Sequence, residues 1–513
     1  MKTVRIICRH SRLSLLQADL VKQRILAVQP DTEVTIIGRS SRGDRELQVS
    51  LASLEGVDFF TEEIYEALEK GEADIAVHSM KDMSATHFFS HTTFAVVDRD
   101  DVHDIAFFNS NIEDKIIRGE PICIGTCSPR REEMAISFLR KALPQLNQEI
   151  KIETRSIRGN VESRLKQLHE GNYDGTILAT AGLNRLLRSE QDAATINILL
   201  KDKKKMLLPL IECVPAPCQG AIVVEAHSSN TAAVALLKQI NDPDLFEESL
   251  KEKQEAYQYG TGCLQKFGVV TLHTQTGNVV YAAGEDTHGN VFYRWKGLPD
   301  VEIDEEQLFA STKHMKDFFE YTWAHKEIAI QQPVVFVANY KAVQSNPSSI
   351  PAKPTQLQGK TIIASGTKTW LELARQGVWV TACADGLGFE FLLPVLKMPV
   401  MNIQSVDICV LTHKEAAERW RKKGYSSISN YELLAIHNER IIKSISASDF
   451  IFWSSYSQYD AYQRYAKPEV THLCAGGETA TLLKQDGLNP VIFPTIKAFE
   501  QWRQISSRSL SVG

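Results

Sequence analysis

The sequence predicts an α/β protein with two similar doubly wound lobes, and three observations lead to this class. Short β-branched runs alternate with amphipathic helical segments from residue 3 onward, which is the pattern of βαβ units. The same alternation starts again near residue 122. A further set of strand-turn motifs repeats itself after residue 333, and the 513 residues leave room for roughly three or four domains.

The first lobe is predicted from two strands that flank a helix. TVRIIC and EVTIIGR are β-branched runs, and the helix between them, residues 12–28, has apolar side chains at helical spacing: Leu13, Leu16, Leu20 and Ile25. Such a βαβ unit places its strands parallel in one sheet. A second helix over residues 60–70 ends at Gly71 and leads into the strand ADIAVHS.

The second lobe is predicted from three more strand-helix segments. They are ICIGTCSPRREEMAISFLRK, IKIETRSIRGNVESRLKQLHEG, and the strand YDGTILATA with the helix after it. In doubly wound sheets, ligands bind beyond the carboxyl ends of the strands, where helix N-termini expose unpaired N–H groups. Candidate functional residues are therefore those that follow the strands.

Composition excludes several classes of protein. With 43% hydrophobic and 23% charged residues the chain has an ordinary globular composition. No apolar stretch reaches the roughly 18 residues of a membrane span, and the N-terminus has no uninterrupted apolar segment typical of a signal peptide. The nine cysteines are scattered and odd in number, which favours a reducing compartment. We expect a soluble, cytoplasmic protein without a membrane partner.

Nucleic acid and metal ions are also disfavoured as ligands. The net charge is -6, and no aromatic residues are interleaved with the arginines, so a nucleic-acid partner is not expected. The cysteine pairs Cys123/Cys127 and Cys213/Cys218 lack the spacing and the histidine partners of a zinc site. We therefore assign no metal.

Arginines gather at the predicted strand ends and indicate a local anion site. Arg9, Arg130, Arg131 and Arg158 follow strands, and Arg164 and Arg185 lie in the helices beyond. The planar guanidinium group binds carboxylate or phosphate through two parallel hydrogen bonds and stays charged at any relevant pH. The alternative is that these arginines lie on helix surfaces, solvated singly or paired with the nearby acidic residues Glu132, Glu133 and Glu162. That alternative suits one arginine better than several at the same topological position.

Two further residues carry chemistry of their own. Asp82 follows an apolar strand, where a carboxylate can stabilise a cationic nitrogen or move a proton, although an aspartate there is more often a turn residue or a helix cap. Cys263 is flanked by Gly260 and Gly262, and these glycines indicate a thiol presented in a loop. Most lone cysteines are nevertheless inert small hydrophobes.

These pieces together resemble porphobilinogen deaminase, also called hydroxymethylbilane synthase, over residues ~3–322. The motifs AVHSMKD, SPRRE, RGNVESRL, LATAGLNRL, PAPCQGA and the glycine-flanked cysteine occur in that family's order. The resemblance implies two periplasmic-binding-protein-like lobes and a small α/β domain that carries a covalent dipyrromethane cofactor on Cys263. It further implies that four porphobilinogen units are added to this primer with loss of ammonia, that Asp82 assists this loss, and that hydroxymethylbilane is released.

The resemblance also assigns the other site residues. Those matching family positions that contact cofactor or substrate carboxylates are Arg9, Ser11, Lys81, Ser128, Arg130, Arg131, Arg158, Arg164 and Arg185, with Gln219 and Gly220 in the stretch between lobes. The chain departs from the family at Val57 and Asp58, where a glycine-flanked lysine is usual, and at Arg12, where a proline is usual. The first departure removes a positive charge from the cover of the site.

The remaining sequence repeats itself. VVFVANY at 334–340 parallels FIFWSSY at 450–456, and IASGTKTWLEL at 363–373 parallels LCAGGETATLL at 473–483. Each copy predicts a strand that enters a helix through a small turn suited to oxyanion contacts, although helix capping by Thr369 and Thr479 is the commoner role of such residues.

This duplication resembles uroporphyrinogen-III synthase over residues ~328–505, a two-lobed α/β enzyme that cyclises hydroxymethylbilane to uroporphyrinogen III. The resemblance puts Ser454, Tyr456 and Thr479 forward as site residues, with interfacial packing as the alternative role of Tyr456. The opening strand-helix unit of that family is expected to be missing. The Pro/Ser-rich residues 345–359 are expected to be a loop within this half.

The predicted organisation is therefore a chain of four domains. They are residues 1–101 with 198–222 returning to them, residues 102–197, residues 223–325 and residues 326–513. The leading functional hypothesis is a bifunctional deaminase and synthase. The alternatives are a noncatalytic two-lobed tetrapyrrole-binding or carboxylate-binding protein, and a deaminase with an inactive second half.

Overall fold

The computed structural model describes residues 1–40, 62–84, 92–145, 149–260, 265–314, 316–324, 329–344 and 354–510. The chain forms two compact units. The first is mainly residues 1–271, and the second is mainly residues 295–513. In the described residues no helix is long and apolar enough to cross a membrane.

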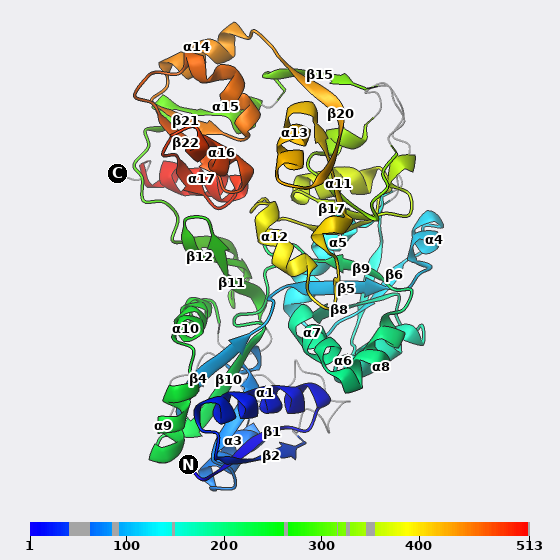
Figure 1. The fold of residues 1–513 in the computed structure, drawn as a ribbon, viewed down its shortest axis with the longest axis vertical. Helices are drawn as coiled ribbons and strands as arrows, with labels where there is room; N and C mark the ends of the chain where they lie inside the picture. Colours follow the sequence, from blue (N-terminus) through cyan, green and yellow to red (C-terminus); the bar gives the residue numbers. More distant parts are fainter. Residues whose placement is uncertain are drawn as a thin grey trace. The chain divides into compact units, whose positions relative to one another are not determined.

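The first lobe is a five-stranded sheet of order β2-β1-β3-β10-β4 (Figure 1). Its strands are β1 (Thr3–Arg9), β2 (Glu33–Arg39), β3 (Ile75–Ser79), β4 (Thr92–Arg99) and β10 (Ala221–His227). Alternate residues of β1 face opposite sides, as a strand requires. Ile6 packs with helices α1 (Arg12–Val28) and α9 (Thr231–Ile240), whereas Ile7 packs against α3 (Glu62–Glu69). The sheet is therefore buried on both faces, which explains the near-continuous apolar strands.

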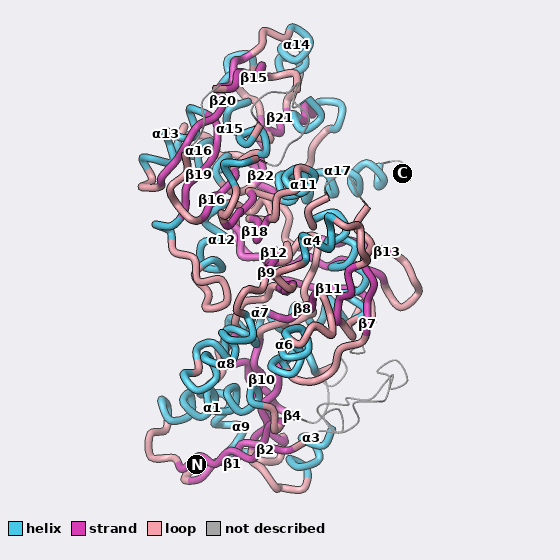
Figure 2. The backbone as a smooth tube through the Cα atoms, turned by 90° about the vertical axis from the view of Figure 1, so that its right-hand side faces the viewer, coloured by secondary structure: helices cyan, strands magenta, loops and turns pink. Residues whose placement is uncertain are grey.

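The second lobe repeats this plan in the order β7-β6-β8-β5-β9. Its strands are β5 (Asp104–Phe108), β6 (Ile122–Gly125), β7 (Ile152–Arg155), β8 (Gly175–Ala179) and β9 (Lys204–Leu207). Its helices are α4 (Ile112–Ile117), α5 (Ile136–Ala142), α6 (Val161–His169), α7 (Thr180–Arg188) and α8 (Glu190–Leu200). A π-helical turn, Arg131–Ala135, leads directly into α5. Figure 2 shows these helices around the strands of the lobe.

Both sheets are mixed, where the βαβ pattern alone predicts parallel strands. In the first sheet β10 is antiparallel to β3 and β4, and in the second β5 is antiparallel to β8 and β9. These two strands directly follow the segments in which the chain crosses between lobes, so each enters its sheet from the opposite direction. The return to the first lobe was expected over residues 198–222. Instead, β9 stays in the second sheet, and β10 and α9 carry the return.

A three-stranded antiparallel sheet follows helix α10 (Pro243–Tyr257). It consists of β11 (Lys266–Thr274), β12 (Gly277–Glu285) and β13 (Val291–Lys296). Phe267 and Val269 of β11 pack with Ala256 of the helix, and the rings of Tyr259 and Phe292 stack with centroids 3.8 Å apart. The helix is thereby packed against the sheet that follows the predicted cofactor cysteine.

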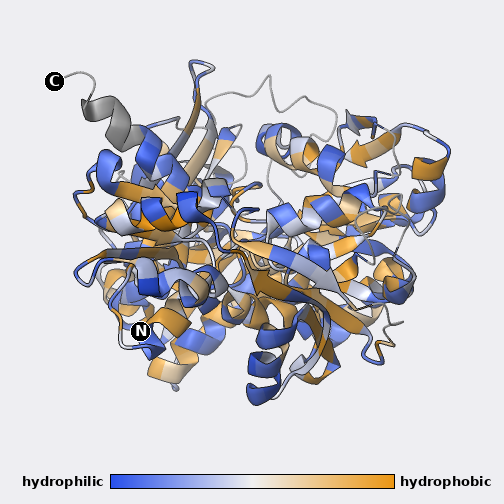
Figure 3. Ribbon diagram, turned by 90° about the horizontal axis from the view of Figure 1, so that it is seen from above, coloured by the Kyte–Doolittle hydropathy of each residue, from blue (hydrophilic) through white to orange (hydrophobic). Residues whose placement is uncertain are grey.

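The second unit contains two further α/β sheets. The six-stranded sheet has the order β15-β20-β19-β16-β17-β18 and the four-stranded sheet has the order β14-β21-β22-β23. The strands are β14 (Leu308–Ala310), β15 (Phe319–Trp323), β16 (Val334–Val337), β17 (Thr361–Ala364), β18 (Val380–Cys383), β19 (Ile408–His413), β20 (Ser426–Ala435), β21 (Phe450–Trp453), β22 (Thr471–Ala475) and β23 (Val491–Phe493). The helices are α11 (Thr367–Arg375), α12 (Phe389–Leu396), α13 (Lys414–Lys422), α14 (Glu439–Ala447), α15 (Tyr456–Tyr462), α16 (Glu478–Gln485) and α17 (Ile496–Leu510). In the chain as a whole many strands are coloured as hydrophobic, while the helices carry both hydrophobic and hydrophilic stretches (Figure 3).

The α/β fold class is confirmed, but the second region begins earlier than residue 326. Strand β14 pairs with β21 in parallel, and β15 pairs with β20 antiparallel, so both belong to sheets of the second unit. Strand β14 is followed by a 3-10 turn, Ser311–His314, and not by a full helix. The absence of the opening strand-helix unit of the resembled family stays a prediction. Most of residues 345–359 lie outside the described part of the chain.

Candidate functional site

Strand ends of the first lobe carry four of the predicted site residues. Arg9 is the last residue of β1, and Ser11 is the N-cap of α1, where its Oγ accepts the Ser14 backbone N–H at 3.3 Å. Lys81 and Asp82 lie in a 3-10 turn, Met80–Asp82, directly after β3. The parallel strands β1 and β3 are neighbours, so their carboxyl ends meet at one edge of the sheet.

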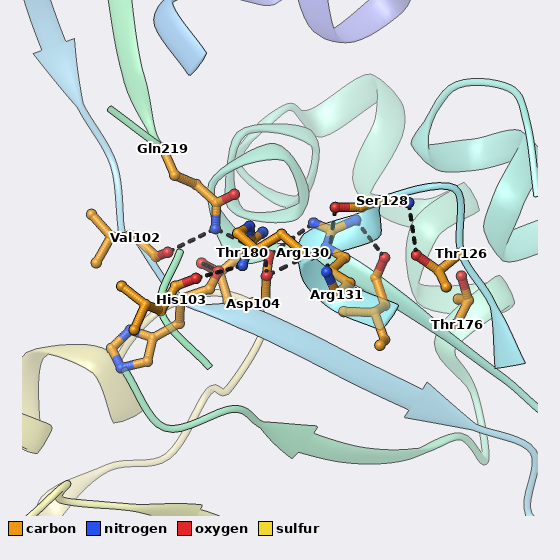
Figure 4. A network of polar contacts seen from close by, with 12 residues as sticks. Val102, His103, Asp104, Thr126, Ser128, Arg130, Arg131, Thr176, Thr180 and Gln219 are labelled. Carbon is orange, nitrogen blue, oxygen red and sulfur yellow. Dashed lines mark hydrogen bonds and ion pairs between the residues drawn. The ribbon is translucent and has the colours of Figure 1, made fainter. Parts of the chain in front are cut away.

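The paired arginines of the second lobe converge on Asp104, the first residue of β5 (Figure 4). Arg130 Nη2 donates to Asp104 Oδ2 at 2.7 Å, and Arg131 Nη2 donates to Asp104 Oδ1 at 2.8 Å. Gln219 Nε2 adds a third donor at 3.0 Å. Arg131 Nε also donates to Asp104 Oδ2, at 3.3 Å. Two further contacts go to backbone carbonyls, from Arg130 Nη1 to Val214 at 2.7 Å and from Arg131 Nη1 to Ile177 at 2.9 Å. Arg130 and Arg131 are 5% and 7% exposed, so neither is a solvated surface residue.

Asp104 was not predicted, although it is the partner that holds both arginines. Burial by itself raises the pKa of this carboxyl, but the charges of Arg130 and Arg131 outweigh burial and lower it. The available signal was an acidic residue at the start of the fully buried strand DIAFF, where an unpaired charge would be costly. Ser128 fixes the start of the same turn, since its Oγ accepts the Arg131 backbone N–H at 3.5 Å.

Arg158 and Arg164 flank the beginning of α6. Arg158 lies in the preceding loop, as predicted, and Arg164 is the fourth residue of the helix. Its Nε donates to the Gly159 carbonyl at 2.9 Å. Burial lowers the pKa of Arg164, with the charges of Arg131 and Arg158 acting in the same direction and that of Asp82 opposing them. Asp82 of the first lobe thus lies within electrostatic reach of Arg164 of the second.

Lys81 of the first lobe also interacts electrostatically with residues of the second lobe. Burial lowers the pKa of its ammonium group, and the surrounding charges are Asp82 and Asp104, which raise it, and Arg131 and Arg130, which lower it. The turn that carries Lys81 and Asp82 therefore faces the cluster around Asp104. Of the predicted residues, Lys81 and Asp82 of the first lobe are thereby connected with Arg130, Arg131, Arg158 and Arg164 of the second.

Arg185 lies in α7, apart from this cluster. Its Nη2 donates to Asp98 Oδ2 at 2.9 Å and to the Gly220 carbonyl at 2.7 Å, so it joins the second lobe to the end of β4 and to the start of β10. Its Nε is buried and has no hydrogen-bond partner in the described part of the chain. Gln219 donates to the Val102 carbonyl at 2.7 Å. A role of Arg185 in carboxylate binding stays a prediction.

Arg12, one of the departures from the family pattern, connects the two lobes directly. Its Nε lies 2.9 and 2.8 Å from the two carboxylate oxygens of Asp192 in α8, and its Nη2 donates to Gln191 Oε1 at 2.9 Å. A proline at this position could make none of these contacts. The substitution therefore replaces a rigid first helical residue with a link between lobes.

Several predicted features lie outside the described residues. Cys263 falls within 261–264, and Val57 and Asp58 fall within 41–61. In the residues that the structure does describe, no group of three or more His, Cys, Asp and Glu side chains is placed to hold a metal ion.

The three candidates of the second unit lie at one edge of the four-stranded sheet. Ser454 and Tyr456 follow β21, Thr479 follows β22, and these strands are parallel neighbours. Ser454 Oγ donates to Gln458 Oε1 at 2.7 Å, and the Tyr456 hydroxyl donates to Asp486 Oδ2 at 2.9 Å. Burial and Asp486 raise the pKa of Tyr456 to about 12.

Capping by Thr369 and Thr479 does not occur, because both lie inside their helices. The N-cap residues are Gly366 and Gly477. Gly477 has a φ of 87°, and a Cβ on it would lie 3.1 Å from the Cα atom of Gly388. Gly388 is the N-cap of α12. Glycine at both positions allows two helix N-termini from different sheets to approach each other through backbone alone.

Comparisons with known proteins match the first half of the chain. The family model described as porphobilinogen deaminase, dipyromethane cofactor binding domain, matches residues 4–235. The porphobilinogen deaminase of Thiobacillus denitrificans is 35% identical over 269 residues, covering 52% of this chain and 80% of that protein. The probable porphobilinogen deaminase of Methanocaldococcus jannaschii is 32% identical over 302 residues, covering 59% of this chain and 94% of the relative.

Among solved structures, the periplasmic VFT2 domain of Bordetella pertussis BvgS is 14% identical with a TM-score of 0.26, covering 50% of this chain and 92% of that domain. A likeness at this level carries no argument, so the fold assignment rests on the sheet orders. The sequence relatives are covered over most of their length at more than 30% identity. The chain therefore belongs to the porphobilinogen deaminase family.

Proposed function

We propose that the first half is a hydroxymethylbilane synthase, which condenses four porphobilinogen units on a covalent dipyrromethane primer and releases hydroxymethylbilane with loss of ammonia. The observation that carries this proposal is the turn of Lys81 and Asp82 after β3. Lys81 lies within electrostatic reach of Arg130 and Arg131 of the second lobe, and Asp82 within that of Arg164. One carboxylate among several buried cations suits a substrate that bears carboxylates and develops positive charge at its reacting carbon.

The residues present fit a carboxylate-rich cofactor. Lys81, Arg130, Arg131, Arg158 and Arg164 are joined electrostatically, while Asp82 and Asp104 are the carboxylates that act on them. Burial is the largest cause of the lowered pKa of Arg164, so the charged guanidinium is costly to keep at this site. A bound carboxylate would stabilise that charge.

Within this site the chain's own groups take distinct roles. When bound, the dipyrromethane supplies the primer to which pyrrole units are added, and Cys263 is the residue that would hold it. The Asp82 carboxylate would accept hydrogen bonds from pyrrole N–H groups and stabilise the positive charge that forms as ammonia leaves. Arg158 and Arg164 would orient acetate and propionate side chains.

The mass of the intact protein tests the proposal. Purified wild-type protein is expected to carry added mass equal to two linked pyrroles, and Cys263→Ala is expected to lack it. Cys127→Ala is the matched control, because Cys127 is half-buried and lies near Arg164. A folded wild type without added mass would favour the noncatalytic carboxylate-binding alternative. Loss of the added mass in Cys127→Ala would show that the cofactor is attached to Cys127 and not to Cys263.

We further propose that the second half is a uroporphyrinogen-III synthase that cyclises the released hydroxymethylbilane. The proposal is supported by the internal duplication, by the two α/β sheets of the second unit, and by the approach of Gly388 to Gly477. Helix N-termini that face each other provide backbone N–H donors for carboxylates without obligatory side chains. The alternative is an inactive second half.

The isomer composition of the product tests the second activity. Full-length protein that turns over porphobilinogen is expected to give uroporphyrinogen III, whereas spontaneous closure gives uroporphyrinogen I. Hydroxymethylbilane supplied directly to the Asp82→Asn protein isolates the second half from the first. Uroporphyrinogen I alone in both assays would contradict the proposal and favour the inactive alternative.

A further inference from the structure

Helix α10 contacts the turn that carries Asp82. Lys253 Nζ donates to the carbonyl oxygen of Met83 at 2.5 Å, and Met83 directly follows Asp82. The lysine is only 4% exposed. A buried ammonium group is costly unless it is hydrogen-bonded. The hydrogen bond to Met83 is therefore part of the packed interior and not a contact of a solvated surface lysine.

The same helix packs on the turn through apolar side chains. Met80 begins the turn and Met83 follows it, and both are buried in one cluster against which Phe246 and Leu250 of α10 pack. Lys81 and Asp82 lie between these two anchors. The apolar contacts fix the distance of the turn from the helix, while the hydrogen bond from Lys253 fixes the orientation of the Met83 peptide group.

Helix α10 is itself held in place by two carboxylates that precede Lys253, Glu248 and Glu252. Glu252 accepts hydrogen bonds from Arg99 Nη2 at 3.0 Å, from the Cys218 backbone N–H at 2.7 Å and from the Thr271 backbone N–H at 2.8 Å. Glu248 accepts from Arg99 Nη1 at 2.6 Å. Both carboxylates therefore contact Arg99, whereas Lys253 donates to the neutral carbonyl of Met83.

We propose that Lys253 is a positioning residue for the reaction of the first half, holding the turn of Asp82 in the orientation that the chemistry requires. The inference rests on the proposed function, because it assigns Lys253 to the same site. Lys253 acts through the Met83 carbonyl and not on the substrate. Its loss therefore lowers kcat and leaves KM nearly unchanged, since displacement of a reacting group by about 1 Å can cost on the order of 10²-fold in rate.

Three substitutions test this role in the full-length, cofactor-loaded protein. Lys253→Met keeps the apolar length of the side chain and removes the donor, and we expect kcat to fall by roughly 10-fold to 100-fold with KM within about twofold. Lys253→Arg keeps charge and donor and is expected to restore most of kcat. Lys251→Met is the matched control, because Lys251 lies on the same helix, is 56% exposed and pairs with Glu247.

The readouts separate positioning from general stability. Cofactor loading, measured by intact mass, and the unfolding midpoint are expected to stay near those of Lys251→Met. Wild-type kcat in a loaded Lys253→Met protein, a raised KM with unchanged kcat, or failure of Lys253→Arg to restore the rate would each overturn the proposal. If Lys253→Met does not fold, Lys253→Gln replaces it, because the shorter amide also loses the Met83 contact and must show the same kcat loss. Added pyrrole mass on wild type upholds the proposed function even if Lys253 proves dispensable.

Discussion

Replacing Asp82 by Asn is expected to lower kcat for porphobilinogen consumption by about 10²-fold to 10⁴-fold, the range typical of removing a positioned acid-base group. The side chain keeps its size, so the turn Met80–Asp82 should fold as before. What disappears is the negative charge that acts on Lys81 and Arg164. Positive charge would then develop on the substrate beside Lys81 and Arg164, without the Asp82 carboxylate to stabilise it.

Steady-state kinetics on the loaded protein checks this expectation. In the proposed function the arginines and not Asp82 bind the substrate carboxylates, so KM should change much less than kcat. Asp31→Asn, in the exposed turn before β2, is the control for loss of one carboxylate elsewhere. If Asp82→Asn keeps kcat within threefold of wild type, Asp82 is not the group that handles the cationic nitrogen.

The positions of Asp82 and the arginines could be predicted because they depend on local pattern. An apolar run ends, a charged residue follows, and the carboxyl ends of neighbouring parallel strands meet in space. The partner of Arg130 and Arg131 could not be predicted in this way. Asp104 reaches them only because β5 lies antiparallel beside β8, and that pairing depends on how the chain crosses between the lobes.

The short strands β14 and β15 were missed for a related reason. Three residues, LFA, carry no periodicity, and β14 is recognised as a strand only through its pairing with Phe450–Phe452, far along the chain. The strand-turn duplication was visible because each copy is a local pattern of strand, small residues and helix. Local patterns therefore predicted the sheets and the site edge, whereas long-range pairing decided the boundary between the regions.

Asp104→Asn is expected to lower the free energy of unfolding of the two-lobed first half by about 3–5 kcal/mol, the cost of removing one partner from a buried ion pair. The amide keeps the shape but leaves the guanidinium groups of Arg130 and Arg131 buried without a counter-ion. Urea unfolding measures the loss. Glu170→Gln, which breaks the exposed pair with Lys166, is the control and should cost at most about 1 kcal/mol.

The pH dependence of stability gives an independent check on the same group. The folded-state pKa of Asp104 is lowered below the roughly 3.9 of an unfolded aspartate. Its contribution is therefore fully present above about pH 4 and is lost as the pH falls through the acid range towards the folded-state value. The wild type should lose stability steeply below about pH 4, and Asp104→Asn should lose it less steeply, because the variant has already lost this contribution. Parallel acid limbs for the two proteins would show that the ion pairs of Arg130 and Arg131 with Asp104 do not stabilise the fold.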